Sequence, residues 1–128
     1  MKNIFLATGT IGGATGVILG AFAAHGLRSV LTEENLRIFH TAVEYQFYHS
    51  FALIICGILI EKNKSKFLIA AGYLFLSGII LFSGSLYVLA INSALGAAGM
   101  ITPLGGLCLI AGWLLLTVSF FRTGHRSS

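Results

Sequence analysis

The side chains that could do chemistry in this 128-residue chain gather between residues 40 and 50. His40 and Glu44 are four residues apart, so on a helix they share one face and can pair directly. Gln46 and His49 lie on a different face of the same helix. Imidazole titrates near neutral pH, and desolvation raises the pKa of a carboxyl toward that range. This pattern could therefore hold a proton or a polar ligand.

A purely structural interpretation uses the same residues differently. Glu44 would pair with a basic neighbour, which could be Arg28, Arg37 or His40. The remaining histidines and Gln46 would then cap helix ends and connectors. Ionisable groups near lipid must face the bundle interior, a partner or a wet cavity, so both interpretations place them away from the acyl chains.

A metal site is a third interpretation, built from His25, His40, Glu44 and His49. Imidazole and carboxylate groups suit zinc or a similar metal. The HExxH spacing is absent, however, and the histidines point from different helix faces. We therefore expect no metal, and keep the proton or ligand site in a cavity at the outer leaflet as the alternative to the structural interpretation.

Polar side chains from several predicted helices reach one level of the membrane. His25 ends the first apolar stretch, and Tyr87 lies toward the same end of the third. We expect four side chains to form one hydrogen-bonded network, with another at its rim. The network would comprise His25, Gln46, His49 and Tyr87, with Glu44 or His40 at the rim.

The elements that position these residues are helices built around four stretches without Asp, Glu, Lys or Arg, at 3–24, 47–60, 67–91 and 104–121. Charged residues make up only 9% of the chain, whereas a soluble domain has about 25%. A helix needs roughly 20 apolar residues to cross the hydrocarbon core. The sequence predicts an all-α polytopic membrane protein, a single domain over residues 1–128 with a bundle of four transmembrane helices. The spans are about 4–24, 42–60, 67–91 and 103–121, with an amphipathic interfacial segment at about 33–41.

The basic residues predict the orientation. With four spans, both termini and the turn at 61–66 share one side, which holds six Lys and Arg residues, while the other side holds two. Cytoplasmic loops carry the excess of Lys and Arg, so we expect both termini in the cytoplasm. The six are Lys2, Lys62, Lys64, Lys66, Arg122 and Arg126, and the two are Arg28 and Arg37.

The first span is dense in glycine at spacings of four residues. Such spacing lets another helix backbone approach closely, which is a main source of helix association in lipid. The partner could be another helix of the same bundle or a second copy of the chain. The predicted helix-packing residues are Gly9, Gly12, Gly13, Gly16 and Gly20.

Four short motifs occur in order along the chain, within a resemblance that extends from about residue 5 to residue 116. On these motifs the chain resembles the YgdD-like family of small four-helix inner-membrane proteins of unknown function. The resemblance implies a fold and a location, and supplies no established reaction, substrate or ligand. The motifs are Ala24-His25-Gly26, Tyr45 to His49, Gly84 to Tyr87, and Thr102 to Gly106.

No enzyme motif is present: GxSxG, a phosphate loop, a dinucleotide fingerprint and a zincin motif are all missing. We expect no enzymatic activity, no cofactor and no nucleic-acid partner, because the positive charges sit at span ends. The expected role is structural or accessory, in the plasma (inner) membrane of a bacterium. The multi-pass bundle would sit in the lipid bilayer and form a homo-oligomer or a subunit of a larger membrane complex. The alternative is a transporter or channel for a proton, ion or small solute that uses the outer-leaflet polar cluster.

Overall fold

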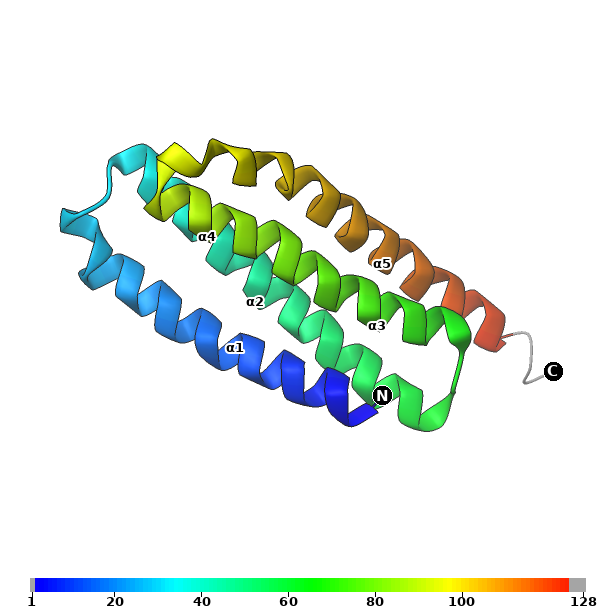
Figure 1. Cartoon of the computed structure of the whole chain (residues 1–128). Helices are drawn as coiled ribbons and strands as arrows, with labels where there is room; N and C mark the ends of the chain where they lie inside the picture. Colours follow the sequence, from blue (N-terminus) through cyan, green and yellow to red (C-terminus); the bar gives the residue numbers. More distant parts are fainter. Residues whose placement is uncertain (1, 125–128) are drawn as a thin grey trace.

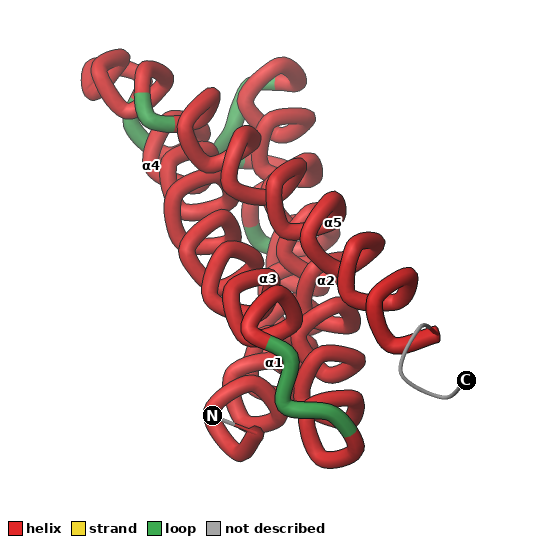
Figure 2. Tube along the Cα trace, turned by 90° about the vertical axis from the view of Figure 1, so that its right-hand side faces the viewer, coloured by secondary structure: helices red, strands yellow, loops and turns green. Residues whose placement is uncertain are grey.

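The computed structural model describes residues 2–124, and these residues are helical almost throughout, with no strand among them (Figure 1; Figure 2). Four helices in this range are long and apolar enough to cross a membrane, which confirms the predicted all-α class. The elements are α1 (Lys2–His25), η1 (Leu27–Ser29), α2 (Glu33–Lys62), α3 (Lys66–Gly78), η2 (Ile79–Ser83), α4 (Gly84–Ile91), η3 (Ser93–Met100) and α5 (Thr102–Gly124).

Helix α2 is continuous through the segment expected at the interface. The Thr32 hydroxyl accepts a hydrogen bond from the Asn35 N–H at 3.1 Å, which caps the helix start. Glu33 and Glu34 follow in the first turn, where the helix dipole favours acidic groups. The amphipathic segment at 33–41 and the span that follows it therefore form one 30-residue helix.

The third predicted span contains a break in helix type that the sequence did not indicate. Between α3 and α4 the chain forms one π-helical stretch, η2. A π turn inserts an extra residue and so changes which residues share a face on either side of it. The connector that follows is a short 3-10 stretch with a kink at Leu95.

The central pair of helices is α2 and the continuous α3–η2–α4 helix. Helix α1 packs mainly along α2, and α5 packs mainly along α3 and η2 (Figure 1). Helices α1 and α2 run antiparallel in a fixed register: Lys2 meets Glu61, and Gly20 meets Val43. This register gives the depth of any α2 residue relative to α1.

Three glycines of α1 bring its backbone close to α2. A Cβ at Gly9 would lie 2.7 Å from the Ile54 side chain, and one at Gly16 would lie 3.1 Å from the Phe47 ring. A Cβ at Gly12 would collide with the Ser50 hydroxyl. The glycine face thus packs within the chain, against α2.

The other two glycines of the predicted set behave differently. A Cβ at Gly20 would make only an ordinary contact with Val43, at 3.5 Å. The packing role predicted for Gly13 is wrong within this chain, because a Cβ there would meet nothing within 4 Å. Gly13 lines a mostly apolar groove of about 310 Å³ between α1 and α2.

A second close approach, which the sequence analysis missed, joins η2 to α5. A Cβ at Gly105 would collide with the backbone of Phe82. A Cβ at Gly78 would collide with the Leu109 side chain, and one at Gly112 would lie 2.8 Å from the Phe75 ring. The Thr102 to Gly106 motif therefore contains a helix-contact glycine.

One end of the bundle carries the N-terminal start of α1, the α2–α3 turn and the end of α5 (Figure 1). The Lys2 ammonium pairs with the Glu61 carboxylate at 2.6 Å. The Asn63 amide donates to the Thr123 hydroxyl at 2.9 Å. We call this the basic end, and the end that carries η1 and η3 the opposite end. The start of α1, the 61–66 turn and the end of α5 thus lie at one end, as predicted, while Arg126 lies outside the described residues.

Candidate functional site

Gln46 joins three helices in the interior of the bundle. Its side chain is buried on α2, and its Nε2 donates to the Gly12 carbonyl of α1 at 2.9 Å and to the Thr15 hydroxyl at 2.8 Å. Its Oε1 accepts a hydrogen bond from the Tyr87 hydroxyl of α4 at 2.6 Å. Both amide N–H groups and the amide oxygen are thus engaged.

The local sequence explains why Gln46 can make these bonds. Gly12 has no side chain, so its carbonyl is accessible to a neighbouring helix. The Tyr87 ring packs edge-on against Phe39, with ring centroids 5.0 Å apart, which directs its hydroxyl along α2. Ser50, one turn further along α2, donates to the Gln46 carbonyl at 2.6 Å. The Gln46 amide therefore ties α1, α2 and α4 together at one level.

His49 makes a separate contact, toward α5. Its Nε2 accepts a hydrogen bond from the Trp113 indole N–H at 3.1 Å, and its Nδ1 lies 2.6 Å from the Tyr45 carbonyl. An indole N–H can only donate, so the proton of the neutral ring sits on Nδ1, which donates to the carbonyl. The ring also lies against Phe75, with centroids 5.9 Å apart. Both nitrogens are used, in a pocket filled by aromatic rings.

Two serines complete the polar contacts near this level. Ser83, in the π turn, donates to the Ala42 carbonyl of α2 at 2.8 Å. Ser85 shares a hydrogen bond of 2.5 Å with the Thr102 hydroxyl at the start of α5. The motifs around Gly84 to Tyr87 and Thr102 thus meet through this bond.

The predicted single network is wrong in its extent. Gln46 and Tyr87 are bonded as expected, but His49 bonds to Trp113 on another side of α2. Among residues 2–124, no hydrogen bond joins His25 to any of these three side chains, and His25 is exposed. Extending the α1–α2 register from Gly20 and Val43 puts His25 level with residue 38. His49 is then about 16 Å away along the axis, at a rise of about 1.5 Å per residue.

His40 and Glu44, the predicted rim of the network, are exposed on the outer surface of α2. The intrachain pairing expected for Glu44 is not formed: in the part of the chain that the structure describes, the only salt bridge is Lys2–Glu61. Within the same residues, no group of three His, Cys, Asp or Glu side chains is placed to hold a metal ion. Arg37 and Tyr48 share the exposed face, as their spacing predicts.

The arrangement holds helices together on two sides of α2. Every buried side-chain nitrogen or oxygen of the described residues has a hydrogen-bond partner. Neither of the two hollows seen, the groove between α1 and α2 and a pocket at the basic end, is lined by Gln46, His49 or Tyr87. The chemical role of these buried groups is to satisfy hydrogen-bonding capacity inside the bundle. The contacts of Trp113 and Thr15 were not predicted, because the sequence around an indole or a threonine does not indicate which side chain it will contact.

Comparison with known proteins identifies relatives along nearly the whole length. Residues 19–106 match the family described as protein of unknown function DUF423. The chain is 38% identical to the UPF0382 membrane protein YwdK of Bacillus subtilis over 118 residues, 91% of this chain and 95% of that protein. It is 42% identical to the UPF0382 membrane protein SH2409 of Staphylococcus haemolyticus over 120 residues, 94% of this chain and 97% of the relative. A UPF0382 membrane protein of Haemophilus influenzae is 38% identical over 124 residues, which are 96% of this chain and 98% of that protein.

The expected kinship with small membrane proteins of unknown function is confirmed by these matches, which carry the names DUF423 and UPF0382 rather than YgdD-like. No solved structure gives a significant match to the chain.

Proposed function

We propose, from the premise that this chain belongs to the DUF423 family of unknown function, that it is a non-enzymatic structural or accessory membrane bundle. It would self-associate, or pack on a larger membrane complex, through the outer face of α2. The supporting observation is how its polar groups are used. Gln46, His49 and Ser83 each form a hydrogen bond to a group on a neighbouring helix. An active site would leave such groups facing a substrate cavity.

The outer face of α2 supports association. Glu44 is followed on one stripe by Tyr48, Phe51, Ile55 and Ile58, at alternating spacings of four and three residues. All five side chains are exposed. This spacing is the seam of a coiled-coil contact, in which two helices pack along matching stripes. We call these five residues the α2 seam.

The charges at one end of the α2 seam favour a protein partner over lipid. In the α1–α2 register, Glu44 lies level with Leu19, more than one turn inside the end of α1. An ionisable group that faces acyl chains is costly, so a partner surface is expected to cover it. Arg37 and His40 stand two turns and one turn before Glu44 on the same side. A stripe that carries both signs can pair with a second copy of itself, as a two-fold interface requires.

Transport of a proton, ion or small solute has less support. A pathway needs polar groups that continue from one side of the membrane to the other. The hydrogen bonds of Gln46 and Ser83 lie in the half of α2 nearer the opposite end, and those of His49 lie near the middle of this 30-residue helix. Toward the basic end, the core is built from apolar side chains such as Phe5, Leu53 and Ile60.

The proposed location is the plasma membrane of a bacterium, with both termini in the cytoplasm. Relatives named membrane proteins occur in Bacillus, Staphylococcus and Haemophilus. The orientation rests on the excess of Lys and Arg at the basic end of the bundle.

Disulfide cross-linking in native membranes tests the proposed association. In a background with Cys56→Ala and Cys108→Ala, Phe51→Cys places a thiol on the α2 seam. Ile11→Cys is the matched control, because Ile11 is exposed on α1 at nearly the same depth. We expect Phe51→Cys to form a covalent dimer on oxidation and Ile11→Cys to stay monomeric.

Other cross-linking results would reject parts of the proposal. Equal cross-linking of both variants would mean random collision and would reject the α2 seam. A monomer in both, with a monomeric mass in mild detergent, would reject self-association. If only Phe51→Cys forms a covalent product, and that product contains a different protein, the homo-oligomer would be rejected. The accessory role in a larger complex would then be supported.

A further inference from the structure

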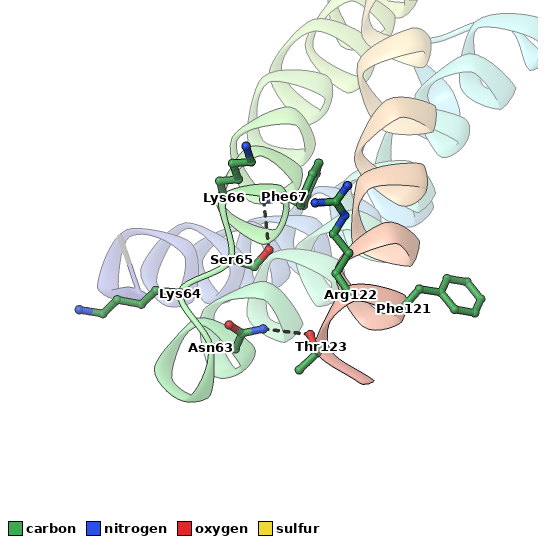
Figure 3. A pocket seen from close by; sticks show the side chains of 8 residues that line it. All are labelled: Asn63, Lys64, Ser65, Lys66, Phe67, Phe121, Arg122 and Thr123. Atoms are coloured by element: carbon green, nitrogen blue, oxygen red, sulfur yellow. Dashed lines mark hydrogen bonds between the residues drawn. The ribbon is translucent and has the colours of Figure 1, made fainter. Parts of the chain in front are cut away.

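A pocket of about 780 Å³ opens at the basic end, between the start of α3 and the last turn of α5 (Figure 3). Its lining includes three basic side chains, which are Lys64, Lys66 and Arg122. None of its lining residues is acidic. The nearest carboxylate along the chain, that of Glu61, is already paired with Lys2 at 2.6 Å. Among residues 2–124, no acidic side chain thus compensates the positive charge of the pocket.

Two of the cations are held at one aromatic ring. The Arg122 guanidinium lies 4.7 Å from the centroid of the Phe67 ring, and the Lys66 ammonium lies 5.6 Å from it. Cation–π contacts attract each cation to the ring. Figure 3 shows the Arg122 side chain extending toward Phe67 across the gap between the two helices. An anion in the pocket would be attracted by both cations.

The frame around the pocket is fixed by hydrogen bonds. The Asn63 amide donates to the Thr123 hydroxyl at 2.9 Å, which ties the α2–α3 turn to α5 (Figure 3). The Ser65 hydroxyl accepts from the Phe67 N–H at 3.2 Å and so caps the start of α3. The helix dipole of α3 adds positive potential at this end. The pocket thus does not depend on a flexible loop to bring its walls together.

The position of the pocket decides the kind of anion. Lys66 is the first residue of α3, and Arg122 lies in the last turn of α5, so the pocket sits where two spans leave the membrane. Phe121, also in its lining, is 76% exposed on the adjoining surface of α5. Figure 3 shows the Phe121 ring pointing outward, away from Lys66 and Arg122. A basic pocket with an exposed aromatic ring at its edge matches a molecule with a negative head and an apolar tail. Basic pockets between transmembrane helices are suited to anionic lipid headgroups.

We propose that this pocket binds the phosphodiester group of an anionic phospholipid, with Lys66 and Arg122 on the phosphate and the acyl chains beside Phe121. A free phosphate ion has the same anionic chemistry but no apolar part. The site is independent of the α2 seam, so its failure would leave the proposed function untouched.

A lipid titration of the full-length protein in a neutral detergent tests the site. The apparent Kd for dihexanoyl-phosphatidylglycerol is read from the shift in melting temperature at constant ionic strength. Removing one basic contact near a membrane surface weakens anionic-lipid binding by about fivefold. We expect this loss in Lys66→Gln and in Arg122→Gln. Lys62→Gln is the matched control, because Lys62 lies at the same end but outside the pocket lining, and it should leave the Kd nearly unchanged.

Three results would overturn the lipid site. Equal weakening by Lys62→Gln and Lys66→Gln would mean diffuse surface charge. Equal stabilisation by dihexanoyl-phosphatidylcholine would mean apolar contact alone. Stabilisation by inorganic phosphate that abolishes the lipid response would mean a soluble-anion site. If Arg122→Gln does not fold because it loses its contact with Phe67, the exposed Lys64 and Lys66 still decide the question, through Lys64→Gln and Lys66→Gln.

Discussion

The indole N–H of Trp113 donates a hydrogen bond of 3.1 Å to Nε2 of His49, and this bond connects α5 to α2 across the bundle. The two rings also meet edge to face, with centroids 5.8 Å apart. Because Tyr45 uses the other imidazole nitrogen, the His49 ring has one orientation that satisfies both contacts. Substitutions at these two residues test this bond.

Trp113→Phe should lower the free energy of unfolding by about 1 kcal/mol, because it leaves the buried His49 Nε2 without a donor. Unfolding in detergent, followed by circular dichroism, measures the change. His49→Phe and the double variant that carries both substitutions complete a double-mutant cycle. If the two residues interact as observed, the double variant should cost less than the two single costs together. Strict additivity would show that the bond contributes nothing.

Tyr87→Phe removes the donor to the Gln46 Oε1 while keeping the ring against Phe39. We expect a loss of about 0.6 kcal/mol in unfolding free energy, the average for side-chain hydrogen bonds within membranes. Tyr73→Phe serves as the control, since Tyr73 is 42% exposed and its hydroxyl makes no hydrogen bond among residues 2–124. Equal stability of the Tyr87 and Tyr73 variants would count against a structural role for the Gln46 junction.

Gly16→Leu should separate α1 from α2, because a Cβ at Gly16 would already lie 3.1 Å from the Phe47 ring. Gly13→Leu is the matched control on the same helix, where a Cβ meets nothing within 4 Å. We expect a lower melting temperature for the first variant and little change for the second. Melting curves in one detergent compare them directly, and an unaffected Gly16→Leu would mean that α1 does not pack on α2 as described.

Gly105→Ala should be the more damaging of two adjacent alanine substitutions. A Cβ at Gly105 would collide with the Phe82 backbone, which cannot rotate away, whereas one at Gly106 would lie 3.7 Å from the Phe82 ring. Overpacking of this kind costs about 1–3 kcal/mol. Thermal unfolding of Gly105→Ala and Gly106→Ala measures the difference. Similar melting temperatures for the pair would contradict the close approach of η2 and α5.

Cysteine labelling in intact cells checks the orientation. With the native cysteines replaced, a membrane-impermeant maleimide added outside should label Ser29→Cys and Ser93→Cys at the opposite end. It should not label Ser65→Cys in the α2–α3 turn at the basic end, because the excess of six basic residues over two predicts that this side faces the cytoplasm. Labelling of Ser65→Cys from outside would invert the topology.

The sequence by itself determined the four spans and their common ends. In lipid every backbone N–H and C=O must be satisfied within its own segment, so a long apolar stretch without charge can only be a helix. The sequence also placed Gln46 and Tyr87 in one hydrogen-bonded network, and these two side chains are bonded to each other. The glycine spacing of α1 likewise indicated a close helix contact, which Gly9, Gly12 and Gly16 make with α2.

Only the tertiary structure decided which side chains meet. Trp113 lies 64 residues from His49, and its bond depends on where α5 lies across the bundle, which no local pattern specifies. The π turn before Gly84 shifts the face of the residues that follow, so a uniform helical period misplaces them. His25 and His49 lie on the adjacent helices α1 and α2 but at different depths in the bundle. The glycine contacts set the antiparallel register of these helices and so separate the two residues. Spacing along one helix fixes its faces, whereas contacts between helices depend on how the whole bundle packs.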